Sequence, residues 1–241
     1  VNSALAKESV NVRAESTPTR RFSVPAAAWP NILRTNSASP SCQRKPSNEG
    51  PTVAGNTSVA QRKKDWRVGA IYPIIPGLLH FTSARTRPVT VGSNVCYFTS
   101  DFPKQYFPFC SDFGPVNLGI IVRFCELMRS KVKAAKSQGL ELIFRSSEDL
   151  LIRTNSAFLV AAYLLLDEGY SPEEAIQPFQ CISPYPFKPY RDATYAPADF
   201  ELSILDCLRG LKKSVSLGWF NHRKFSLHDY ERWDNPENGD L

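Results

Sequence analysis

The sequence predicts an α/β fold in which a small central sheet is covered by helices and preceded by a disordered tail. Three observations predict it. The first 66 residues lack apolar periodicity, short β-branched and aromatic runs follow from Val68, and the second half repeats apolar residues at three- and four-residue spacing. Strands come first, then a strand-loop-helix segment, then helices. The 241 residues, 42% of them hydrophobic, suffice for one such domain.

Residues 1–66 form the predicted tail. They are rich in Ser, Thr, Pro, Ala and Arg, and such a composition cannot offset its ordering entropy by burial. Residues 1–67 hold eleven Lys and Arg against four Asp and Glu, a net charge of +7, whereas the whole chain has +6. A basic tail could meet acidic partners, nucleic acid or a localisation receptor. Because the folded part is not basic, we do not expect nucleic acid as its partner.

Two tail positions are candidate phosphorylation sites. Thr17 begins a Thr-Pro-x-Arg sequence of the form that proline-directed kinases prefer, and Ser39 begins the minimal Ser-Pro form. A Ser- and Pro-rich tail also contains such dipeptides by chance. An Arg- and Ser-rich organellar transit peptide is another interpretation of this segment.

Composition argues against several classes of site. The six cysteines form no CxxC pair, and the three histidines show no spacing typical of a metal site or a catalytic base, so we expect no metal and no cofactor. The longest apolar run, residues 158–166, is far shorter than the about 20 residues that cross a bilayer. No membrane segment is therefore expected. A chain that begins at Val1, without an initiator Met or a secretory leader, is expected to be a fragment or a processed form.

Four short apolar runs predict strands. Residues 78–83, 95–99 and 106–110 are expected to form a meander, and residues 140–144 a further strand. Proline punctuates the later part of the chain, where Pro184, Pro186 and Pro189 favour an extended loop through Tyr190.

Periodic segments predict four helices. The first follows residues 112–115, with Asp112 as its cap, Pro115 in its first turn and apolar residues recurring to Val132. A very apolar helix is predicted over residues 155–167, closed by Gly169. The sequence from Ser171 to Glu174 is a capping box that begins a third helix, and an amphipathic pattern predicts a fourth over residues 198–217.

Six sequence blocks carry a resemblance to a known family. They are residues 111–118 (SDFGPVNL), 153–159 (RTNSAFL), 171–175 (SPEEA), 186–193 (PFKPYRDA), 204–210 (ILDCLRG) and 236–240 (PENGD). In this order, over residues 78–241, they resemble the N-terminal half of the cell-division-cycle-fourteen, or mitotic-exit, type of dual-specificity protein phosphatases.

The resemblance implies two phosphatase-like α/β domains joined by a helix, of which only the second carries the catalytic cysteine. Residues 67–232 would be the first domain, and residues 233–241 the start of an acidic inter-domain linker. The implied partners are the C-terminal catalytic domain of the same protein and phosphoprotein substrates with Ser-Pro followed by a basic residue. In that family, acidic residues attract this basic residue, and Glu237 and Asp240 match the acidic block. A solvated acidic face is the alternative.

Catalysis by such phosphatases requires a cysteine thiolate and, six residues later, an arginine that binds two phosphate oxygens. No cysteine of this chain meets this requirement. The nearest equivalent is the strand-loop-helix segment 143–154, in which Ser147 stands six residues before Arg153. Because Glu148 and Asp149 would repel a phosphate dianion, we predict a degenerate phosphate loop. A structural ion pair of Arg153 and residual phosphate or sulfate binding are both open interpretations.

The sequence therefore predicts a substrate-recognition and scaffold domain of a dual-specificity phosphatase that is inactive without its catalytic half. A free-standing pseudophosphatase adaptor is the alternative. An unrelated α/β metabolic enzyme is a weaker one, because the chain has no phosphate-binding Gly loop and no catalytic triad pattern. The nucleus and the cytoplasm are the expected compartments.

Overall fold

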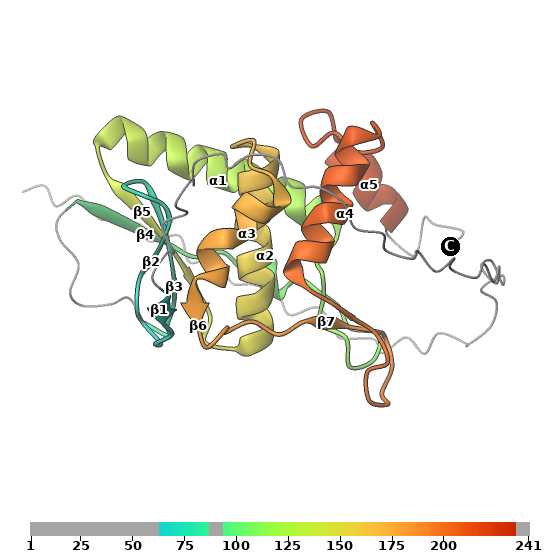
Figure 1. Ribbon diagram of the computed structural model, residues 1–241. Helices are drawn as coiled ribbons and strands as arrows, with labels where there is room; N and C mark the ends of the chain where they lie inside the picture. Colours follow the sequence, from blue (N-terminus) through green and yellow to red (C-terminus); the bar gives the residue numbers. More distant parts are fainter. Residues whose placement is uncertain (1–62, 87–93, 235–241) are drawn as a thin grey trace, which may run out of the picture. The chain divides into compact units, whose positions relative to one another are not determined.

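The computed structural model describes residues 63–86 and 94–234, and in it a four-stranded sheet lies beside helices (Figure 1). The strands are β2 (Tyr72–Ile75), β3 (Leu79–Ser83), β4 (Val95–Phe98) and β5 (Glu141–Ser146), in the spatial order β2-β3-β5-β4. Two further pairs join β1 (Lys64–Asp65) to β6 (Ile182–Ser183) and β7 (Tyr190–Arg191) to β8 (Glu201–Leu202). The predicted α/β class is confirmed.

The main sheet is mostly parallel. Strand β5 lies between β3 and β4 and pairs in parallel with both, so that Phe144 stands opposite Phe81 on one side and Phe98 on the other. Only β2, which forms a hairpin with β3, is antiparallel. The predicted meander is therefore wrong. The buried apolar strand β5 takes an interior position in the sheet. This fits its composition, because parallel strands are normally covered on both faces.

Two strand assignments also differ from the sequence prediction. Residues 106–110, predicted as a strand, form a loop after the short 3-10 helix η1 (Phe102–Lys104). The backbone N–H groups of Phe109 and Cys110 donate to the carboxylate of Asp112, at 3.3 and 2.7 Å, so a side chain replaces a strand partner. Strand β2 was not predicted. It contains Pro73, which is tolerated because β2 is an edge strand.

Helix α1 (Leu118–Gln138) begins later than its predicted cap. Asn117, not Asp112, caps it, because the Oδ1 atom of Asn117 accepts the N–H of Ile120 at 2.9 Å while Asp112 is bonded in the preceding loop. Pro115 lies outside the helix. The predicted apolar stripe of α1 is buried as expected.

Helix α2 (Leu150–Leu166) is the centre of the helical layer. It begins five residues before the predicted start, because Asp149 caps it. Every residue from Arg153 to Leu165 is buried, and α1, α3 and α4 all pack against it. Gly169 follows the end of the helix at a φ of 80°, a left-handed conformation that suits glycine.

The remaining helices are α3 (Pro172–Gln180), α4 (Ile204–Ser216) and α5 (Leu227–Asp234). The capping box of α3 is confirmed: Ser171 N–H donates to Glu174 Oε2 at 2.8 Å, and Glu174 N–H to Ser171 Oγ at 3.2 Å. Helix α4 begins at its own capping box after Ser203, six residues later than predicted, because the residues before it form strand β8. Helix α5, which the sequence did not predict, has no buried residue.

Candidate functional site

The C-terminal ends of the parallel strands β3, β4 and β5 meet at one edge of the sheet, where ligands bind in many α/β folds. A cavity of about 620 Å³ lies there. It is lined by Ala84, Arg85, Thr99, Ser100, Asp101, Lys104, Arg145, Ser146, Ser147, Glu148 and Asp149. The loop 147–149 connects β5 to α2, so the predicted degenerate phosphate loop forms part of this cavity wall.

The N-terminus of α2 is already occupied by a carboxylate. The Oδ1 atom of Asp149 accepts hydrogen bonds from the backbone N–H groups of Leu151 and Ile152, both at 2.9 Å. These donors are the groups with which a helix N-terminus binds a phosphate or sulfate. The side chain of Asp149 therefore takes the place of an external anion.

Arg153 does not line the cavity. Its Nε donates to the carbonyl of Pro186 at 2.9 Å, its Nη1 donates to the carbonyl of Glu148 at 3.0 Å, and its guanidinium lies 4.7 Å from the centre of the Trp66 ring. The side chain is buried, and burial lowers the pKa of Arg153. Arg153 is thus bonded to carbonyls and lies over an indole, with the charge of Asp149 nearby, and residual phosphate or sulfate binding stays a prediction.

Ser147 lies in the cavity wall, and the recorded bond of its hydroxyl is to the backbone. Its hydroxyl accepts the N–H of Asp149 at 3.2 Å, and its carbonyl accepts the hydroxyl of Ser83 at 2.6 Å. No histidine or cysteine is among the residues that line this cavity. The structure thus brings Ser147 and Arg153 to one loop-helix junction but does not direct them toward a common point.

The cationic side chains that line the cavity also have partners within the protein. Arg85 pairs with Glu148 at 3.0 Å, and Lys104 pairs with Asp101 at 2.6 Å. The guanidinium of Arg145 donates to the carbonyls of Ala84 and Arg85, at 3.0 and 2.6 Å. A phosphate would have to compete with these internal partners for every cation in the cavity.

The cysteine thiols described in the helices are poor nucleophiles. Burial raises the pKa of Cys125, and burial followed by the neighbouring Asp206 raises the pKa of Cys207 to about 11. Since the thiolate is the nucleophile, both groups are almost entirely protonated near pH 7.

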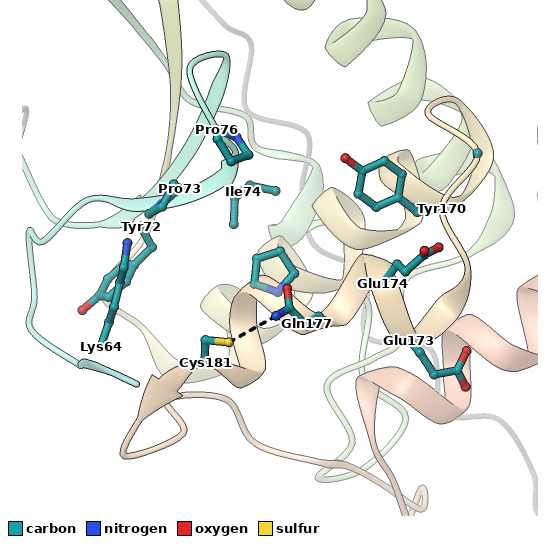
Figure 2. A pocket seen from close by; sticks show the side chains of 12 residues that line it. Lys64, Tyr72, Pro73, Ile74, Pro76, Tyr170, Glu173, Glu174, Gln177 and Cys181 are labelled. Carbon is teal, nitrogen blue, oxygen red and sulfur yellow. Dashed lines mark hydrogen bonds between the residues drawn. The ribbon is translucent and has the colours of Figure 1, made fainter. Parts of the chain in front are cut away.

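A second, larger hollow lies between the edge strand β2 and helix α3 (Figure 2). Its volume is about 990 Å³, and we call it the β2–α3 groove. It is lined by Lys64, Tyr72, Pro73, Ile74, Pro76, Gly169, Tyr170, Glu173, Glu174, Gln177, Pro178 and Cys181. Figure 2 shows Ile74 and Tyr170 facing each other across it, with the carboxylates of Glu173 and Glu174 along one side.

Both groove carboxylates are held in their charged form. The hydrogen bond from Arg209 lowers the pKa of Glu173, and the hydrogen bonds from the backbone and hydroxyl of Ser171 lower the pKa of Glu174. The groove therefore combines an apolar floor with the two carboxylates and with the ammonium group of Lys64. No sequence pattern predicted this groove, although Pro73 and Pro76, which flank an apolar pair, indicate an edge strand.

Four predicted site residues, Thr17, Ser39, Glu237 and Asp240, lie outside the described ranges. The histidines have structural partners: His80 Nε2 lies 2.6 Å from Glu141 Oε2, and His222 Nε2 lies 3.2 Å from Asp167 Oδ1. Over residues 63–86 and 94–234, no cluster of His, Cys, Asp and Glu could hold a metal ion. Within the same ranges, the helices are too short or too polar to cross a membrane.

Comparison with known proteins relates the chain to phosphatases. Residues 73–214 match the family described as "Dual specificity protein phosphatase, N-terminal half". The mouse dual specificity protein phosphatase CDC14A is 35% identical over 163 residues, which are 68% of this chain and 27% of the relative. Mouse CDC14B is 30% identical over 224 residues, 92% of this chain and 44% of the relative.

A fission-yeast relative, the tyrosine-protein phosphatase CDC14 homolog of Schizosaccharomyces pombe, is 33% identical over 183 residues, 74% of this chain and 34% of the relative. The chain thus spans less than half the length of each of these relatives. The match covers the β5–α2 loop and the β2–α3 groove except for Lys64 and Tyr72, which precede it. This chain belongs to the CDC14-type dual specificity protein phosphatases and corresponds to their N-terminal half.

Proposed function

We propose that this chain is a non-catalytic, substrate-binding half of a dual-specificity phosphatase and acts together with a catalytic domain. The observation that carries the proposal is the β5–α2 junction. There the carboxylate of Asp149 fills the helix N-terminus, and the guanidinium of Arg153 is bonded to the carbonyls of Pro186 and Glu148. A junction in which the cap of α2 and the guanidinium of Arg153 are bonded internally supports a framework role in place of phosphate binding.

Inactivity of the isolated chain follows from its nucleophiles. Phosphoester hydrolysis of this class needs a thiolate or an activated hydroxyl in reach of a bound phosphate. The recorded bond of the Ser147 hydroxyl is to the backbone N–H of Asp149 and not to a histidine or a carboxylate that could act as its base. The raised pKa values of Cys125 and Cys207 argue against either thiol as a substitute.

Substrate recognition is assigned to the β2–α3 groove. Its length beside an edge strand and its apolar floor suit an extended polypeptide segment, and the carboxylates of Glu173 and Glu174 suit basic residues within that segment. We propose that phosphoprotein substrates lay a segment remote from the phosphorylated residue into this groove. Glu237 and Asp240 are proposed to attract the basic residue that follows the phosphorylated Ser-Pro.

The test is to assay the purified chain alone and with a catalytic half. Alone, it should not hydrolyse a small aryl phosphate above buffer, and Ser147→Ala should change nothing. Together with a catalytic half, Glu237→Lys with Asp240→Lys should lower kcat/KM about two- to tenfold for a Ser-Pro phosphopeptide bearing a downstream Lys. The rate on the aryl phosphate should not change. Turnover by the chain alone that one cysteine substitution abolishes would refute inactivity, and equal losses on both substrates would refute a recognition role for the acidic residues.

A further inference from the structure

The end of helix α4 and the turn that follows it form a basic segment with two exposed apolar side chains. Residues 209–224 hold five Lys and Arg and no Asp or Glu. Within this segment, Leu217 is 50% exposed and Trp219 is 77% exposed. We call residues 212–224 the α4–α5 tip. In Figure 1 the connection from α4 to α5 lies at the upper end of these helices, whereas β7 lies at their lower end.

The local fold keeps the indole of Trp219 in solvent. Gly218 has a φ of 72°, a left-handed conformation that suits glycine. The N–H groups of Trp219 and Phe220 both donate to the carbonyl of Ser214, at 2.9 and 3.3 Å. Phe220, the next residue, is buried, and its ring lies 5.5 Å from the ring of Phe225. The turn is thus closed by backbone bonds and anchored by Phe220, and it leaves Trp219 outside the core.

A buried carboxylate fastens the tip to the end of α2. Asp167 follows α2 directly, and its side chain is 2% exposed. Its carboxylate accepts from Arg223 of the tip at 2.5 Å and from Arg129 of α1 at 3.0 Å. The Nε2 atom of His222 lies 3.2 Å from the same carboxylate. These bonds hold the tip in one shape, and a pre-organised surface loses little conformational entropy when it binds.

Three lysines give the tip a positive charge that the domain does not neutralise. The two arginines of residues 209–224 are paired, one with Asp167 and the other with Glu173. Lys212, Lys213 and Lys224 are exposed, and over residues 63–86 and 94–234 their ammonium groups form no ion pair. The tip therefore presents uncompensated positive charge next to apolar surface, and this combination complements an anionic partner.

We propose that the α4–α5 tip binds the surface of an anionic lipid bilayer. Trp219 and Leu217 enter the headgroup region, where amphipathic and apolar side chains are favoured, and the three lysines meet the negative headgroups. Contact of this kind needs no helix that crosses the membrane. The inference is independent of the proposed function.

Other anionic partners fit the tip less well. Protein interfaces are depleted in lysine, and a partner that wraps a basic helix requires the apolar face of that helix. Helix α4 buries this face in the domain through Ile204, Leu208 and Leu211. Single-stranded nucleic acid is held in a basic groove beside aromatic side chains, but Leu217 and Trp219 line neither of the two hollows described above. A lipid surface needs no groove, so it matches apolar side chains exposed on a turn.

The test is co-sedimentation of the full chain with vesicles of phosphatidylcholine alone and of phosphatidylcholine mixed with phosphatidylserine. The wild type should bind the mixed vesicles more tightly. Two double variants, Leu217→Ser with Trp219→Ser and Lys212→Ser with Lys213→Ser, should each raise the apparent Kd for the mixed vesicles about tenfold. Added salt should reduce the effect of the lysine variant and leave the effect of the apolar variant, because salt screens only the charges.

The controls replace similar side chains elsewhere on the domain. They are Phe107→Ser with Phe109→Ser, two exposed rings on the loop after η1, and Lys131→Ser with Lys133→Ser, two exposed lysines of α1. Each should change the apparent Kd by about twofold at most. The basic residues 1–62 are present in every variant, so differences between variants report on the tip.

Thermal unfolding should remain cooperative in all variants, because the replaced side chains are exposed, and Trp219→Ser alone serves if a double variant does not fold. Equal binding by the wild type and both tip variants would overturn the inference and assign vesicle binding to residues 1–62. A wild type that binds both kinds of vesicle equally would overturn it as well. Tip-dependent binding to polyglutamate or single-stranded DNA, without binding to vesicles, would assign the tip to another anionic macromolecule and overturn the lipid surface as its partner.

Discussion

The cavity at the β5–α2 junction and the β2–α3 groove are two hollows of one domain, and they differ in the chemistry of the side chains that line them. In the first, of about 620 Å³, the helix N-terminus, the cations and Arg153 all have internal partners. In the second, of about 990 Å³, apolar side chains line an open space, and the carboxylates of Glu173 and Glu174 remain exposed although they bond Arg209 and Ser171. The polar groups of the cavity at the usual ligand-binding edge of an α/β sheet thus bond to other groups of the domain and stabilise the fold. Position in a fold therefore identifies a candidate site, and the state of its polar groups decides whether that site can bind.

The strongest test of this contrast is Arg153→Ala. Removing the guanidinium leaves the carbonyls of Pro186 and Glu148 without these donors and the Trp66 ring without its cation. We expect a loss of about 3 kcal/mol in the free energy of unfolding, measured from urea titrations. Arg85→Ala is the matched control in the same junction. Its side chain is 86% exposed, and its loss should stay below about 1 kcal/mol. Equal losses for the two variants would contradict a framework role of Arg153.

A smaller effect is expected for Asp149→Ala, which removes the cap of α2. The loss should be about 1 kcal/mol, and the uncovered N–H groups of Leu151 and Ile152 should become a site for anions. Sulfate should therefore raise the Tm of this variant more than that of the wild type. Asp149→Asn keeps an oxygen at the cap and controls for the general effect of sulfate on stability. The same sulfate dependence in all three proteins would show that Asp149 does not occupy an anion site.

In the groove, Tyr170→Ser should change binding more than stability. Tyr170 is half-buried against the open space, so its replacement removes apolar contact area for a bound segment. We expect the affinity for a long phosphoprotein segment to fall about tenfold, measured by fluorescence anisotropy, with no change for a short phosphopeptide that cannot reach the groove. Tyr185→Ser, at a tyrosine that is 47% exposed outside the groove, is the control. Equal losses for the long and the short ligand would place substrate recognition elsewhere.

The smallest expected effect is a dependence of groove binding on pH. Because the pKa values of Glu173 and Glu174 are lowered, both carboxylates stay charged as the pH falls from about 7 to about 5. Affinity for a basic segment should be constant over this window and decrease only at lower pH, where the two groups become protonated. A decrease that already begins near pH 6 would point to histidine in place of these carboxylates.

Much of the fold could be predicted from local patterns. The interior strand at residues 141–146, the buried helix α2 and the capping box before α3 depend on neighbouring residues, so their signals are present in the sequence. The order of strands could not be predicted, because pairing of β3 and β4 with the later strand β5 is decided by packing between distant segments. The cap of α1 was misassigned for a similar reason. Asp112 and Asn117 are both good caps, and what distinguishes them is that Asp112 is bonded within its own loop, by the Tyr106 hydroxyl and two backbone N–H groups.

Local and long-range determinants also account for what could be predicted of the β5–α2 loop and of the β2–α3 groove. The spacing of Ser147 and Arg153 located the degenerate loop, since a strand-loop-helix motif is contiguous in sequence. The direction of the Arg153 side chain could not be predicted, because its partners Trp66 and Pro186 come from remote parts of the chain. The groove requires a β2 residue and a residue just before α3, about 100 positions apart, to face each other, as Ile74 and Tyr170 do.

The stack of Trp66 between Arg153 and Tyr72 makes this junction visible to fluorescence. The Trp66 and Tyr72 rings are 5.4 Å apart and nearly parallel, and the guanidinium of Arg153 lies 4.7 Å from the indole centre. Trp219 and Trp233 are 77% and 60% exposed, so their emission should resemble that of an indole in water. Of the three tryptophans in the part of the chain that the structure describes, Trp66 should therefore have the most blue-shifted emission. It gives an optical signal for attachment of strand β1 to the domain, which can be followed during unfolding or partner binding without any added label.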